Sequence, residues 1–115
     1  MTRDMDLIRL ILLKAHQNDP NGLIDGYSED EIRYHRKLAI DKGLLKGHVL
    51  EDHRRSSPVP ANVVVEDLTW EGHDFIDAIQ SDSNWNKVKE YLLAGGKQIT
   101  IETIKFSIHA LFGVP

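Results

Sequence analysis

The stretch Leu68–Ile79 constrains the fold of this chain more than any other part of it. It follows a segment rich in β-branched residues, and Thr69 suits a helix N-cap because its hydroxyl can accept from a first-turn N–H. Apolar or small residues then recur at the spacing of one helix face: Gly72, Phe75, Ile76 and Ile79. The stretch therefore predicts a threonine-capped helix that leaves the second strand of a β-ribbon.

The segment from residue 4 to residue 17 reads as the first helix, with Asp4 or Thr2 as its N-cap. Its apolar residues cover more than half of the helical cylinder, which predicts a central position in the core. Arg9 is expected on the solvent side of this helix.

Turn residues end this helix at 18–22, and residues 23–25 are expected to form a short strand. Ser28 and Glu31 form a capping box, which predicts a second helix to about Lys42. Gly43 suits the left-handed position after it.

Residues 44–51 and 61–67 are predicted to be two strands, joined by a polar linker that would form the tip of a wing. Two more helices are expected, over about 84–93 and from the cap Thr100 to about residue 112.

This order of elements predicts an α+β fold of the winged-helix type: helix, short strand, helix and two-stranded wing, with additional C-terminal helices. Residues 1–80 would be the winged-helix domain and residues 81–115 a helical extension, together one compact domain. The region before the capping box is too short and too rich in turn residues for the extra helix that a helix-turn-helix usually has there.

Composition limits the functions open to the chain. The 115 residues include no cysteine, which excludes disulfides, thiolate nucleophiles and cysteine-ligated metals. We expect no signal peptide and no membrane span, and hence a cytoplasmic protein. The histidines lack metal-ligand spacing and no serine lies in a nucleophile-elbow context, so no metal, cofactor or catalytic residue is predicted.

Several of these motifs together resemble an uncharacterised bacterial and prophage family, the domain of unknown function 2513. The matching segments are Arg3–Arg9, Gly26–His35, Gly43–Leu44 and Leu68–Ile79, followed by Trp85. There is also a more distant similarity to small winged-helix proteins of phage origin. The resemblance implies a winged-helix fold and a phage or mobile-element setting, and it implies no activity.

The candidate nucleic-acid surface is the outward side of the second helix together with the wing. Residues 33–55 carry seven basic and three acidic side chains, although the net charge of the chain is −4. The residues expected to contact phosphates or bases are Arg33, Arg36, Lys37, Arg54 and Arg55. The alternative is a solvated face, since Glu29, Asp30 and Glu31 crowd the helix start.

The leading functional hypothesis is a small phage-associated DNA-binding or regulatory protein. The alternative is a protein-interaction module that uses the winged-helix scaffold without binding nucleic acid and modulates a host or phage complex. A homodimer is expected through the last helix, whose second apolar sector consists of Phe106 with Ser107 and Ala110.

Three residues that could suggest chemistry are expected to be packed instead. His35 shares the apolar stripe of its helix, and Trp85 lies at core spacing with later apolar residues. Trp70 opens its helix and is expected to seal the edge of the sheet.

Overall fold

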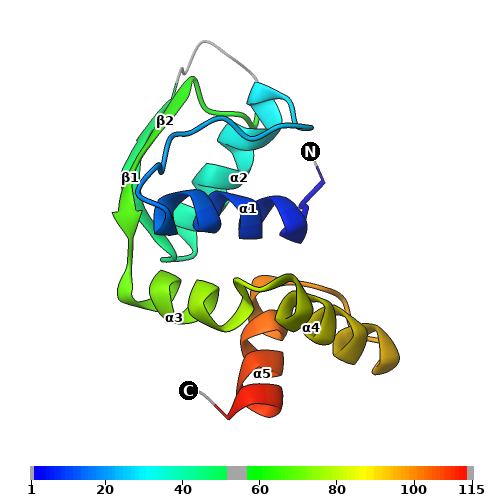
Figure 1. The fold of residues 1–115 in the computed structure, drawn as a ribbon. Coiled ribbons are helices and arrows are strands. Elements are labelled where there is room, and N and C mark those ends of the chain that lie inside the picture. Colours follow the sequence, from blue (N-terminus) through cyan, green and yellow to red (C-terminus); the bar gives the residue numbers. More distant parts are fainter. Residues whose placement is uncertain (1, 52–56, 114–115) are drawn as a thin grey trace.

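The computed structural model describes residues 2–51 and 57–113. Within these ranges the chain forms five helices and a two-stranded antiparallel sheet, which confirms the α+β class (Figure 1). In chain order the elements are α1 (Met5–His16), α2 (Glu29–Asp41), β1 (Leu45–Leu50), β2 (Asn62–Leu68), α3 (Trp70–Ile79), α4 (Asp82–Ala94) and α5 (Ile101–Phe112).

The helix starts follow the predicted caps. The Asp4 carboxylate accepts hydrogen bonds from the first-turn N–H groups of α1. Ser28 and Glu31 form the reciprocal capping box of α2. The Thr69 hydroxyl accepts from the N–H of Gly72, 3.0 Å away. Each cap satisfies N–H groups that have no partner within the helix, and this fixes where the helix begins.

Strands β1 and β2 pair with one irregularity between Lys46 and Gly47. Val63 and Val65 are buried on the inner face, whereas Val64 and its partner His48 are exposed on the outer face. This alternation is what a sheet with one covered face requires.

The predicted short strand at residues 23–25 is wrong, since that segment has no strand. Beside β2, the Asn21 side chain replaces the predicted strand. Its amide donates to the Val65 carbonyl at 2.8 Å and accepts from the Val65 N–H at 2.9 Å. One side-chain amide thus supplies the donor and acceptor that a third strand would have offered to Val65.

Helix α1 crosses the middle of the molecule (Figure 1). It packs against α2 and β2 on one side and against α3 on the other, so its apolar residues join both halves of the core. Helix α5 packs against α3 and α4. The domain boundary expected near residue 80 falls between α3 and α4 and stays a prediction.

None of the helices in the described ranges has the length and apolar character needed to cross a membrane.

Candidate interaction surfaces

The outward cations of α2 are paired within their own helix. Arg33 donates to Asp30 at 2.6 Å, and its other terminal nitrogen lies 3.8 Å from a Glu29 oxygen. Lys37 donates to Asp41 at 2.9 Å, and this hydrogen bond raises the pKa of Lys37. Both side chains, which the sequence predicted to face solvent, are only partly exposed.

Arg36 is half-buried and contacts the loop before α2. Its guanidinium donates to the Gly22 carbonyl at 3.2 Å, and its Nε is buried without a hydrogen-bond partner in the described residues. Burial lowers the pKa of Arg36, and the charge of Asp19 opposes this effect. The contact ties the loop before α2 to the helix, and Arg36 is therefore not the exposed side chain that the sequence predicted.

Of the wing, only the paired strands can be compared with the predicted nucleic-acid surface. Arg54 and Arg55 lie outside the described residues, so their placement beside α2 stays a prediction. On the described outer face of the sheet, His48 lies 2.7 Å from Glu66. That face therefore presents a carboxylate beside its histidine, and not an uninterrupted basic surface.

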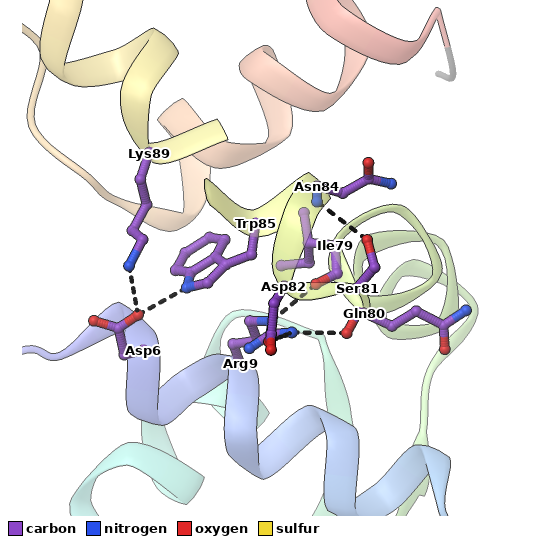
Figure 2. A network of polar contacts seen from close by, with 9 residues as sticks. All are labelled: Asp6, Arg9, Ile79, Gln80, Ser81, Asp82, Asn84, Trp85 and Lys89. Carbon is purple, nitrogen blue, oxygen red and sulfur yellow. Dashed lines mark hydrogen bonds and ion pairs between the residues drawn. The ribbon is translucent and has the colours of Figure 1, made fainter. Parts of the chain in front are cut away.

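A polar network joins α1 to the corner between α3 and α4 (Figure 2). Arg9 donates to the carbonyls of Ile79 and Gln80 at 2.8 and 2.7 Å, and it pairs with Asp82 at 3.0 Å. The prediction that Arg9 faces solvent is wrong, because its residue is only 7% exposed. Periodicity missed this role because the carbonyls that need Arg9 lie about seventy residues later in the chain.

Asp6 forms the second half of this network (Figure 2). Its carboxylate accepts from the Trp85 indole N–H at 2.7 Å and from Lys89 at 3.2 Å. Burial raises the pKa of Asp6, but these two hydrogen bonds and the charges of Lys89 and Arg9 outweigh it and leave the pKa below its ordinary value. Trp85 itself is buried, as predicted.

His35 is packed, as predicted, and only 1% exposed. Its Nε2 accepts from the N–H of Asp4 at 2.8 Å, and its Nδ1 lies 2.7 Å from the carbonyl of Glu31. A neutral ring with its proton on Nδ1 satisfies both contacts. The residue therefore joins α1 to α2, and no group of three metal-ligating side chains occurs in the described parts of the chain.

The predicted interface on α5 is only partly exposed. Phe106 is 51% exposed and Ala110 is also exposed, but the Lys97 ammonium lies 5.0 Å from the Phe106 ring centroid and covers part of it. The inclusion of Ser107 is wrong: it is fully buried and donates to the Thr103 carbonyl at 2.8 Å. Ser107 lies on the same side of the helix as the buried isoleucines, which pack on α3 and α4.

The sequence predicted that Trp70 seals the edge of the sheet. This prediction is wrong, because Trp70 is 86% exposed. The buried face of α3 is set by Gly72 and Phe75, and Trp70, two residues before Gly72, falls on the opposite side of the helix. A large aromatic side chain is therefore held in solvent at the start of a capped helix.

A cleft of about 250 Å³ lies between α3 and α5. It is lined by Glu71, Asp74, Phe75, Lys105 and Ile108. Lys105 lies 3.4 Å from Glu71 across the opening, and Asp74 has no hydrogen-bond or ion-pair partner in the described residues. Sequence reasoning missed the cleft because its two walls are separated by about thirty residues and meet only in the folded chain.

Comparisons with known proteins give a family and no activity. The family described as "Hypothetical protein (DUF2513)" matches residues 2–98. An "Uncharacterized protein" of Haemophilus influenzae is 32% identical over 111 residues, covering 91% of this chain and 90% of the relative. No solved structure shows a significant match. The segments that carried the resemblance are thus part of a match over most of the sequence, and the chain belongs to the DUF2513 family.

Proposed function

We propose that this protein is a protein-interaction module built on a winged-helix scaffold. The order α1, α2, β1, β2 and α3 supports the scaffold, because a helix is followed directly by a two-stranded hairpin and a closing helix. In this arrangement α2 takes the place of a recognition helix, and the loop that Arg36 and Asn21 anchor replaces the helix that usually precedes it.

The observation that carries the proposal is the pairing of the basic side chains on α2. The helix has three basic and four acidic residues, and each of its basic groups is already bound to a carboxylate or a carbonyl of its own chain. DNA binding gains affinity when free lysine or arginine side chains neutralise phosphates and release the counterions condensed on the DNA. This face would have to break its own ion pairs before it could contact DNA.

Apolar exposure on the three C-terminal helices supports a protein partner. Trp70 and Leu93 are among the most exposed large apolar side chains, and Phe106 is half-exposed. They lie on α3, α4 and α5, and not on α2. Exposed aromatic residues are typical anchors of protein interfaces.

Self-association is the second candidate, and the exposure of Phe106 in the middle of α5 and of Ala110 in its last turn favours it. A two-fold dimer would place the same α5 surface of each copy against the other. The prophage setting and the cytoplasmic location predicted from the sequence stay predictions.

Binding to a fluorescent random-sequence DNA duplex at low and at moderate salt tests the proposal, with the mass in solution measured in parallel. We expect no saturable binding at moderate salt. Weak binding at low salt should fall equally in Arg33→Ala/Lys37→Ala and in the control Lys87→Ala/Lys97→Ala, because both remove two positive charges. Saturable binding at moderate salt would overturn the proposal, and its selective loss in the first variant would place the DNA on α2.

A further inference from the structure

We propose that the cleft between α3 and α5, together with the neighbouring Trp70, binds a basic segment of a partner protein. An apolar side chain of the segment would enter the cleft, and a lysine or arginine beside it would lie between Asp74 and Trp70. This inference rests on the proposed function and names the chemistry of its partner.

The floor of the cleft is apolar and fixed. Phe75 and Ile108 line it and are nearly fully buried in the core, so their positions are set before any partner arrives. The volume of about 250 Å³ is below the range of roughly 300–1,000 Å³ that holds a drug-sized ligand. The cleft therefore suits a side chain of a larger partner better than a free small molecule.

The charge around the cleft selects a basic segment. Two carboxylates, Glu71 and Asp74, and one cation, Lys105, line the cleft. Glu71 is neutralised by Lys105, but Asp74 lines the same cleft without a partner in the described residues. A cation from a partner would supply the missing charge, whereas an acidic segment or a phosphate backbone would be repelled.

Trp70 does not line the cleft but adds an exposed aromatic side chain next to Glu71 in the chain. It precedes Glu71 and lies four residues before Asp74, which places Trp70 and Asp74 on one face of α3. The backbone there is held by Thr69, whose hydroxyl donates to the Gly43 carbonyl and accepts from the Gly72 N–H. The indole is thus presented from a rigid position, where a lysine or arginine can stack on its face.

The test uses a peptide with two central leucines flanked by two lysines at each end. Trp85 is buried, so acrylamide quenching of tryptophan fluorescence reports mainly on Trp70. We expect the peptide to protect Trp70 from the quencher and to shift the amide resonances of residues 70–75 and 105–108. Peptides with glutamate in place of lysine, or glycine in place of leucine, should bind at least about tenfold more weakly, equivalent to about 1.4 kcal/mol.

Three variants separate the cleft from general attraction between opposite charges. Asp74→Asn and Trp70→Ala change exposed side chains and should each weaken binding about tenfold, with Trp70→Ala followed by the amide resonances. Glu90→Gln removes an exposed carboxylate from α4 and should leave binding unchanged.

Several results would overturn the inference: no binding of the lysine–leucine peptide, equal binding of the glutamate peptide, an equal effect of Glu90→Gln, or resonance shifts confined to the outer face of α5. None of these results contradicts the proposed function, because the partner protein would then bind another surface of the module. Saturable binding of duplex DNA at moderate salt would instead overturn the proposed function. The peptide measurements would still decide whether the cleft binds a basic segment.

Discussion

Gly72 lies directly against the backbone carbonyl of Leu44, so a β-carbon at this position would overlap the carbonyl oxygen. The same carbonyl accepts a hydrogen bond from the N–H of Thr69, 3.1 Å away. The start of α3 is thus seated on the turn between α2 and β1, and glycine is the residue that permits this approach.

Gly72→Ala should therefore destabilise the protein by about 1–3 kcal/mol, the usual cost of overpacking. Within an exposed helix the same change would be stabilising, because alanine has the higher helix propensity. Urea unfolding followed by circular dichroism measures the effect. Gly95→Ala is the matched control: its φ is −85° and the atoms nearest to a β-carbon there lie 3.6 Å or more away, so its stability should be unchanged or slightly higher.

Arg9→Met should lower the free energy of unfolding by about 2–3 kcal/mol, because it leaves the carbonyls of Ile79 and Gln80 without their charged donor. Asp82→Asn should cost less than about 1 kcal/mol, since the Asp82 side chain is 91% exposed and water screens its pair with Arg9. Chemical unfolding of both variants checks this order. Equal losses would mean that the ion pair, and not the carbonyl contacts, stabilises the corner.

The Asp6 carboxylate should make stability depend on acid pH. Its pKa is lower in the folded protein than the ordinary 3.8, so the unfolded chain binds the proton more readily and the stabilisation is present above about pH 3.8. It is lost as the pH falls through the lower, folded pKa. Asp6→Asn keeps an oxygen that can accept from Trp85 but removes the charge.

Unfolding measured from about pH 5 down to about pH 2 should show the wild-type and Asp6→Asn proteins converging in stability. A gap of constant size across that range would contradict the role given to the charge.

His35→Ala should destabilise by about 2–4 kcal/mol, since it opens a cavity and leaves the Asp4 N–H and the Glu31 carbonyl without their ring partner. His48→Ala, on the exposed face of β1, should change stability by less than about 0.5 kcal/mol. Thermal unfolding of the two variants compares them directly, and similar melting temperatures would contradict the packing role of His35.

If α5 mediates self-association, Phe106→Glu should convert a dimer into a folded monomer by placing like charges at the two-fold contact. Sedimentation equilibrium measures the mass. Asn86→Glu adds the same charge to an exposed position on α4 and should leave the dimer intact. A wild-type protein that sediments as a monomer would contradict this prediction.

The sequence by itself determined the local features of the fold. Caps such as Ser28 and Thr69 form hydrogen bonds within one helical turn. The alternation of buried and exposed side chains around Val63 and Val65 follows from successive residues of one strand. The helix caps, the two paired strands and the buried His35 could therefore be predicted, because the interactions or periodicities behind them are encoded by neighbours in the chain.

The tertiary structure decided which side chains are exposed and which are buried in contacts between elements. Arg9 is buried because distant carbonyls at the α3–α4 corner need a donor, and Asn21 replaces a strand because β2 offers it an open backbone edge. Ser107 is buried because α5 packs on its neighbours with this side. Trp70 is exposed because Gly72 packs against Leu44, which turns the opposite side of α3 to the solvent. The candidate cleft likewise exists only where α3 meets α5, since burial and charge pairing depend on segments far apart in sequence.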